Sequence, residues 1–153
     1  MVSFDLADPG VVERHKNRFC DFICNVADII FANRREAYLL YGLSPQETAN
    51  KMARLGNKIA VIKLDSQGAI VQKDNQYFCV DALKTSVVDS TGAGDMFASG
   101  FLYGFCDGKS LKDCAHLGAV LAANVISSLG TEISNDLLIN IKKGKLLEYT
   151  SLH

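Results

Sequence analysis

The chain lacks an excess of charge of either sign, and it lacks a long apolar run. Its 153 residues contain 16 Lys and Arg against 17 Asp and Glu, a formal net charge of −1. A nearly neutral chain has no global attraction for nucleic acid or an anionic membrane surface, so neither partner is predicted. No uninterrupted apolar run approaches the roughly 20 residues that span a bilayer, and Asp5 and Asp8 stand where a signal peptide carries positive charge. We therefore predict a cytoplasmic protein.

Several metal-binding and catalytic motifs are also missing. The five cysteines form no CxxC pair near suitably spaced histidines, so no zinc site is predicted. Phe97 stands where a dinucleotide fingerprint needs its third glycine, and the chain contains no GxxxxGK[ST], HExxH or GxSxG. The composition is 48% apolar and 22% charged, which is typical of a folded globular protein and excludes disorder.

What is present is an alternation of strands and helices. Strands are predicted at 2–6, 28–32 and 58–64 and in a hairpin of 69–72 with 76–80, and helices at about 11–24, 34–41, 45–55, 94–106, 110–128 and 135–147. An Asp-Pro-Gly turn signal at 8–10 follows the first strand. The alternation predicts an α/β fold with a mostly parallel sheet, and the absence of repeats and linkers predicts one structural unit. The first strand is of the kind that has a neighbouring strand on each side. We therefore expect the strands that would pair with its outer edge to be missing.

The densest chemistry lies in residues 89–95, Asp-Ser-Thr-Gly-Ala-Gly-Asp, which lead directly into a helix. Two glycines around an alanine let backbone N–H groups converge, and the helix start adds the positive end of its dipole, so the loop predicts an anion site. Asp95 would lie beside that site and could accept a proton from a hydroxyl that attacks a bound phosphate. A helix N-terminus with an ordinary cap is the alternative interpretation of the same residues.

Three segments resemble one known family. Residues 89–95 and the small-residue helix 96–104 look like the C-terminal signature of the ribokinase or PfkB carbohydrate kinase family, which includes adenosine kinases. Residues 32–36, Ala-Asn-Arg-Arg-Glu, are similar to the family's Asn-x-x-Glu motif at a strand end, and 63–68 occupy the place of its nucleotide-binding turn. The resemblance implies a ribokinase-like fold, a Rossmann-like and mostly parallel sheet flanked by helices, truncated on its N-terminal side. It also implies transfer of the γ-phosphate of ATP to a hydroxyl of a sugar or nucleoside, such as adenosine or ribose.

The resemblance also implies roles for individual residues. Asp95 corresponds to the catalytic base, and the amides of Gly92, Ala93 and Gly94 to an anion hole for the phosphoryl group. Glu36 would organise Mg²⁺ and its water ligands. The nucleotide would contact Asn33, Lys63, Leu64, Asp65, Ser66, Gln67, Gly68 and Gly94. Without the resemblance, Glu36 is interpreted as a surface carboxylate in the first turn of a helix, and residues 63–68 are interpreted as a plain turn.

A monovalent cation such as K⁺ is a further implication. Asp89 and Thr91 match positions that hold this cation in ribokinases, and the segment 125–134, which contains Gly130, matches the other side of the cation loop. The sequence also departs from the family pattern. Asp65 stands where many members have glycine, and Ala119 stands where ribokinase has an asparagine near the adenine. Contacts to the base are therefore expected to differ.

Residues 1–153 are interpreted as the C-terminal, nucleotide-binding and catalytic half of a ribokinase-like domain. The lid and the N-terminal substrate-binding half that family members carry are absent from this sequence. Phosphorylation would then need the missing half in a parent chain or a separate polypeptide, and a homodimer is another way of covering the exposed sheet edge. The alternative is a catalytically inactive remnant that at most binds nucleotide.

Overall fold

The computed structural model describes residues 1–56 and 58–145. These residues belong to two compact units, 1–79 and 80–153, where the sequence predicts one structural unit. The boundary lies just before a stretch, residues 81–92, that forms neither helix nor strand. None of the helices in the described part of the chain is both long and apolar enough to cross a membrane.

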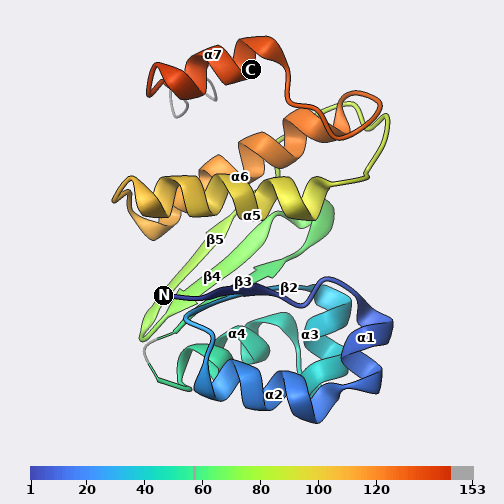
Figure 1. The fold of residues 1–153 in the computed structure, drawn as a ribbon, viewed down its shortest axis with the longest axis vertical. Coiled ribbons are helices and arrows are strands. Elements are labelled where there is room, and N and C mark those ends of the chain that lie inside the picture. Colours follow the sequence, from blue (N-terminus) through green and yellow to red (C-terminus); the bar gives the residue numbers. More distant parts are fainter. Residues whose placement is uncertain (57, 146–153) are drawn as a thin grey trace. The chain divides into compact units, whose positions relative to one another are not determined.

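The first unit is built around a sheet whose strands follow one another in sequence order (Figure 1). The strands are β1 (Ser3–Asp5), β2 (Ile29–Asn33), β3 (Ile59–Lys63), β4 (Ala69–Lys73) and β5 (Gln76–Val80). β1, β2 and β3 are parallel, whereas β4 runs antiparallel to β3 and β5 lies beside β4. The predicted α/β fold with a mostly parallel sheet is confirmed, and so is the hairpin at its end.

Helices α1–α4 lie on one face of this sheet (Figure 1). They are α1 (Pro9–Arg14), α2 (Lys16–Asn25), α3 (Arg34–Tyr41) and α4 (Pro45–Ala53). Both α3 and α4 begin with a capping box, in which the cap side chain and a glutamate at the third helical position satisfy each other's backbone N–H. α3 ends at Gly42, which has a φ of 68° in the left-handed region that glycine adopts without steric cost.

The start of the first helical segment differs from the prediction. Asp8, Pro9 and Gly10 do not form a turn: the Asp8 side chain accepts a hydrogen bond from the Val11 N–H, and Pro9 is the first residue of α1. An Asp-Pro pair favours a helix start as well as a turn, because proline at the first helical position loses no hydrogen bond. The predicted single helix is also divided at His15 into α1 and α2.

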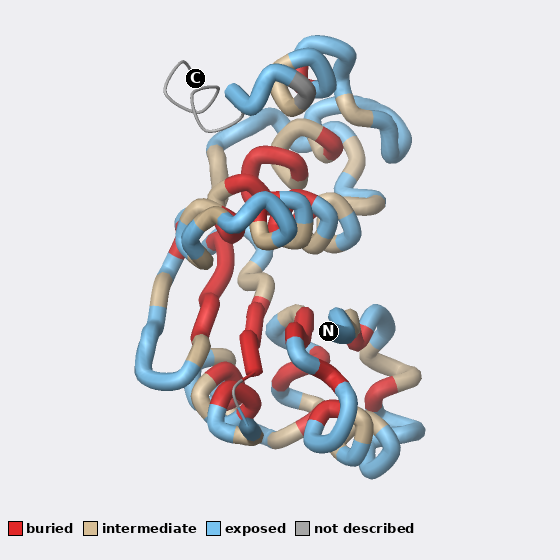
Figure 2. Tube along the Cα trace, turned by 60° about the vertical axis from the view of Figure 1, so that its left-hand side comes forward, coloured by how far each residue is buried: buried red, intermediate tan, exposed pale blue. Residues whose placement is uncertain are grey.

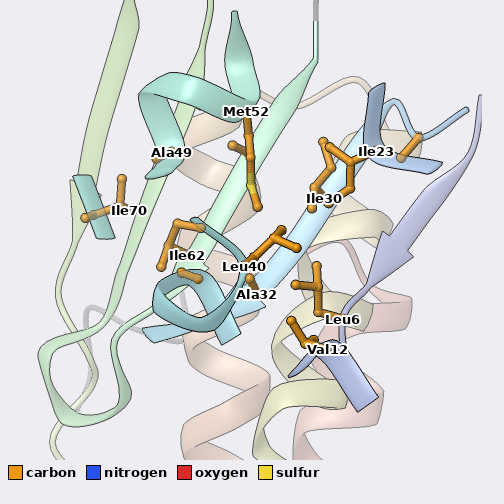
Figure 3. Packing of buried hydrophobic residues seen from close by; sticks show 13 residues of the cluster. Leu6, Val12, Ile23, Ile30, Ala32, Leu40, Ala49, Met52, Ile62 and Ile70 are labelled. Carbon is orange, nitrogen blue, oxygen red and sulfur yellow. The ribbon is translucent and has the colours of Figure 1, made fainter. Parts of the chain in front are cut away.

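The core of the first unit lies between the sheet and its helices. Figure 3 shows Ile30, Ala32 and Ile62 from the strands meeting Leu40 and Met52 from α3 and α4, all of them fully buried. Along β2 and β3 four successive residues are buried, so these strands are covered on both faces, as expected for parallel strands (Figure 2). This buried centre fixes the carboxyl ends of β2 and β3, where the predicted site residues lie.

The second unit consists of helices α5 (Ala93–Cys106), α6 (Leu111–Ile126) and α7 (Asn135–Lys142). α5 and α6 pack closely through glycines: a Cβ added at Gly100 would lie 2.6 Å from the Leu117 carbonyl oxygen, and one added at Gly118 would lie 2.7 Å from the Phe97 carbonyl oxygen. α7 contributes the buried Leu137 to an apolar cluster with α6. α7 ends at Lys142, so the predicted helix is too long over residues 143–145, and its last two predicted residues, 146 and 147, lie outside the described residues.

Candidate functional site: two loops

Polar side chains gather at the carboxyl ends of the parallel strands β1, β2 and β3. Asp5 ends β1, Asn33 ends β2 and Lys63 ends β3, and Asn33 and Lys63 are direct register partners. The Lys63 Nζ donates to Asp5 Oδ2 at 2.6 Å, and both side chains are mostly shielded from solvent. In open α/β sheets, ligands bind at this edge. The structure therefore places Asn33 and Lys63 together, as the prediction requires.

Glu36 lies beneath this edge as part of the cap of α3. Its Oε2 accepts from the Asn33 N–H at 2.7 Å, while Asn33 Oδ1 accepts from the Glu36 N–H at 2.8 Å. Glu36 is 1% exposed, so the interpretation as a surface carboxylate is wrong. Burial raises the pKa of Glu36, and the Asn33 hydrogen bond and the positive charge of Lys63 act against that rise. The buried carboxylate is thus held beside a cation at the carboxyl end of the sheet.

The turn after β3 has the tight backbone that the sequence predicts at 63–68. Asp65–Gln67 form a 3-10 turn, the Leu64 N–H donates to the Gly68 carbonyl at 2.7 Å, and Gly68 has a φ of 87°. Asp65 has a φ of 55°, in the left-handed region that glycine adopts without steric cost. The Arg34 side chain donates to Gln67 Oε1 and so connects the turn to the start of α3.

The glycine loop of the second unit forms the start of α5. Gly92 is the N-cap with a φ of 78°, and no side chain caps the helix at this described terminus. The backbone N–H groups at the helix start are therefore not satisfied by a cap side chain, in contrast to α3, α4 and α6. Asp95 is exposed in the first turn, and a Cβ on Gly92 would lie 3.0 Å from Thr131 Cγ2. The alternative of an ordinary side-chain cap is wrong.

Asp89 and the segment around Gly130 lie together in the second unit, as the sequence predicts. Asp89 Oδ1 accepts from the Thr91 N–H at 2.9 Å and from the Thr91 hydroxyl at 2.7 Å. The Thr91 hydroxyl holds the pKa of Asp89 below its ordinary value, and the amides of Thr91 and Gly130 add to this effect. The Val88 N–H donates to the Ile126 carbonyl at 2.8 Å, which ties the loop to the end of α6.

The chemistry of these donors decides how they could hold a metal ion. No cluster of three or more His, Cys, Asp or Glu side chains suited to a metal occurs among residues 1–56 and 58–145. Glu36 Oε2 accepts a hydrogen bond from the Asn33 N–H, so only its other oxygen could accept one from a water ligand of a metal ion. Asp89 likewise keeps Oδ2 outside its hydrogen bonds to Thr91. Both residues fit a supporting role toward a cation and not an all-protein cage.

The sequence missed two residues at these loops. Asp5 forms an ion pair with Lys63, which is a candidate cofactor-binding residue. The available signal was that Asp5 lies near the end of a predicted strand. Thr131 lies against Gly92, within the segment 125–134 that the sequence matched to the other side of the cation loop, but Thr131 itself was not singled out. Ala119, at the departure from the family pattern, is buried in α6.

The comparison with known proteins identifies the family. Residues 7–137 match the sequence profile described as pfkB family carbohydrate kinase, and the chain belongs to this family. An uncharacterized sugar kinase from Archaeoglobus fulgidus is 37% identical over 133 residues, which are 84% of this chain and 51% of that protein. The chain therefore spans about half the length of this curated relative.

Solved structures give the same result for the fold. A probable sugar kinase from Rhizobium etli superposes with a TM-score of 0.85 at 39% identity over 94% of this chain and 44% of that one. An adenosine kinase from Sinorhizobium meliloti superposes with a TM-score of 0.84 at 32% identity over 93% of this chain and 44% of that one. The predicted family and the ribokinase-like fold class are thus confirmed.

Proposed function

We propose that this chain is the nucleotide-binding and catalytic half of an ATP-dependent kinase that phosphorylates a hydroxyl of a sugar or nucleoside. The observation that carries the proposal is the start of α5, where a left-handed Gly92 opens a helix without a side-chain cap and Asp95 is exposed in the first turn. Family membership supports the phosphotransfer class. Relatives described as an ATP-dependent 6-phosphofructokinase and a cytidine kinase support ATP as donor and both acceptor classes.

In the proposed mechanism, the backbone N–H groups of Gly92, Ala93 and Gly94 hold the oxygens of the transferred phosphoryl group. The loop supplies N–H donors and the positive end of a helix dipole where negative charge develops. The Ala93 N–H, which donates to the Ser90 carbonyl at 3.3 Å, would exchange that hydrogen bond for one to the phosphoryl group. Asp95 accepts the proton of the acceptor hydroxyl while the oxygen of that hydroxyl attacks the γ-phosphorus. The bond between this phosphorus and the leaving ADP oxygen breaks. The exposure of Asp95 supports this role, because a general base must reach a hydroxyl outside the protein.

The residues of the first unit are proposed to bind the donor nucleotide. Asn33, Lys63 and the turn at 64–68 would contact ATP, and Glu36 would orient water ligands of Mg²⁺. When bound, Mg²⁺ neutralises the phosphate charge during transfer. Asp89 and Thr91 would place a monovalent cation near the glycine loop. The protein is proposed to act in the cytoplasm.

The experiment compares Asp95→Asn with the unchanged chain. ADP formation is measured with adenosine, ribose and fructose, for the chain alone and for the chain co-expressed with the N-terminal half of the related sugar kinase from Archaeoglobus fulgidus. We expect Asp95→Asn to lower turnover by at least about 100-fold, the usual contribution of a general base, while ATP binding is retained. Asp136→Asn, an exposed first-turn acid of α7, is the matched control and should leave turnover unchanged.

Two results would overturn the proposal in different ways. Equal turnover in Asp95→Asn and the unchanged protein would remove Asp95 from its role as base. ATP binding without turnover in either setting would favour the alternative of a catalytically inactive, nucleotide-binding remnant.

A further inference from the structure

Two cysteines lie about one turn apart on the same face of α2. Cys20 is half-buried, Cys24 is exposed, and all five cysteines of the chain are free thiols. Residues four apart in a helix have their Cβ atoms about 5–6 Å from each other. The two thiols are therefore neighbours that a small ion can reach from solvent. The kinase reaction proposed above uses neither of them.

Polar groups of the neighbouring helices surround this pair. The Tyr41 hydroxyl lies beside the Cys20 thiol, shielded from solvent and without a regular hydrogen-bond partner in the described part of the chain. The Lys51 Nζ lies 4.4 Å from the centre of the Tyr41 ring. Neither Lys51 nor Lys16 takes part in an ion pair with any other residue that the structure describes. Burial raises the pKa of the Cys20 thiol, whereas the hydroxyl and the two lysine charges lower it.

The spacing of the thiols decides what they can form. A disulfide needs Cβ atoms about 3.5–4.5 Å apart, so Cys20 and Cys24 cannot be joined directly while α2 remains helical. Two metal–sulfur bonds of about 2.3 Å each let the sulfur atoms lie up to about 4.6 Å apart, which suits Cβ atoms at the helical spacing. The helix therefore favours one bridging ion over a disulfide.

The number and softness of the ligands select the ion. Structural zinc takes four protein ligands, whereas no cluster of three or more His, Cys, Asp or Glu side chains suited to a metal occurs within the ranges 1–56 and 58–145. Thiolates are soft ligands that select Cu(I), and this ion is satisfied by two sulfur atoms in a linear arrangement. Cu(I) with two thiolates carries one net negative charge, which the charges of Lys16 and Lys51 offset.

We infer that Cys20 and Cys24 form a binding site for a single Cu(I) ion. Each thiol releases its proton to solvent as its sulfur binds the ion, and the oxidation state of copper does not change. The Tyr41 hydroxyl supports the site by donating to the Cys20 sulfur. The site is separate from the proposed nucleotide site, because Asn33 caps the start of α3 and Tyr41 is its last residue, about 12 Å further along the helix.

Competition with bicinchoninate, a coloured chelator of Cu(I), tests the inference on the full chain without oxygen and with ascorbate as reductant. One equivalent of Cu(I) should pass from the chelator to the unchanged chain. Cys24→Ser should weaken Cu(I) binding by at least about 100-fold, because the same helix no longer supplies a second sulfur atom. Cys106→Ser, which removes an exposed cysteine of α5, is the matched control and should bind Cu(I) as the unchanged chain does.

A double variant tests the helical spacing. Cys24→Ser combined with Asn25→Cys keeps the number of thiols but moves one of them off the face that Cys20 occupies, so it should not restore Cu(I) binding. Circular dichroism of each variant establishes that it is folded.

Three results would overturn the inference. They are failure of the unchanged chain to withdraw Cu(I) from the chelator, equal affinity in Cys24→Ser and Cys106→Ser, and full binding by the double variant, which would make the number of thiols decisive and not their spacing. Asp95→Asn should bind Cu(I) normally, so failure of the kinase proposal and failure of this one give different results.

Discussion

The carboxylate of Glu36 is subject to two opposing influences. Burial raises its pKa, whereas its hydrogen bond from the Asn33 N–H favours the charged form. In the exposed capping box of α4, Glu47 has no such burial, and the Ser44 hydroxyl holds its pKa below the ordinary value. The same local motif therefore has opposite electrostatic consequences at the two helices.

This contrast predicts opposite effects of glutamine. Burial disfavours the ionised form of Glu36, so keeping Glu36 ionised lowers the stability of the fold. This loss of stability is full at neutral pH and disappears as the pH falls below 4.5, the ordinary pKa of a glutamate. Glutamine keeps an acceptor for the Asn33 amide, so Glu36→Gln should equal or exceed the parent in stability at pH 7, by up to about 1 kcal/mol. The difference should shrink at pH 4, as measured by urea unfolding at both pH values.

Glu47→Gln is the matched control, and its expected change in stability has the opposite sign. Its lowered pKa means that the ionised form stabilises the fold above the ordinary value of 4.5, and this stabilisation is lost as pH falls through the lowered value. Glu47→Gln should therefore lose stability at pH 7. A larger loss for Glu36→Gln than for Glu47→Gln would contradict this account.

At the scale of elements, local signals predicted α3 and α4 well and the first helical segment less well. α3 begins and ends as predicted, at Arg34 and Tyr41, because its cap and Gly42 are local features. The helix start at Pro9 was missed because its residues equally favour a turn. The ion pair of Asp5 with Lys63 was missed for another reason: it depends on which strands are neighbours, and periodicity carries no such information. The glycine loop was predicted because its backbone chemistry is local to seven residues.

The glycines between α5 and α6 lead to a prediction about these elements. Gly118→Ala would push a Cβ to 2.7 Å from a backbone carbonyl, which a side-chain rearrangement cannot relieve. We expect a loss of about 1–3 kcal/mol in the free energy of unfolding, the usual cost of overpacking. Gly104→Ala is the comparison, since its nearest contact at 2.7 Å is the terminal Leu117 Cδ1, which can rotate away.

Thermal and urea unfolding of both variants measure the difference. Gly104→Ala should lose less, because Leu117 Cδ1 can move away and the gain in helix propensity that both substitutions share then offsets more of the cost. Equal losses at the two positions would show that the backbone contact at Gly118 is not what limits the packing.

At the scale of the molecule, β1 forms one side of the sheet of the first unit. It pairs with β2 on one side, and among residues 1–56 and 58–145 no strand pairs with its other side. β2 and β3, in contrast, are paired on both sides. A strand with one open edge protects fewer of its amides and offers a template for another strand.

Hydrogen exchange measures this edge directly. In the isolated chain, amides of β1 should exchange faster than those of β2 and β3, because local opening of an edge strand breaks fewer contacts. Equal protection of β1 and β2 would show that the edge is covered, for example by a second copy of the chain. Repeating the measurement over a tenfold range of protein concentration distinguishes these cases.

The order of the strands also bears on how the chain acquires its structure. Each strand of the first unit pairs with the next one in sequence, from β1 to β5. Only the connections from β3 to β4 and from β4 to β5 are short, whereas the parallel pairs β1–β2 and β2–β3 are joined through helices α1–α4, and parallel pairings of this kind form slowly. During synthesis, every pairing of this sheet becomes possible as soon as β5 has emerged, while the glycine loop and its helices are still being translated.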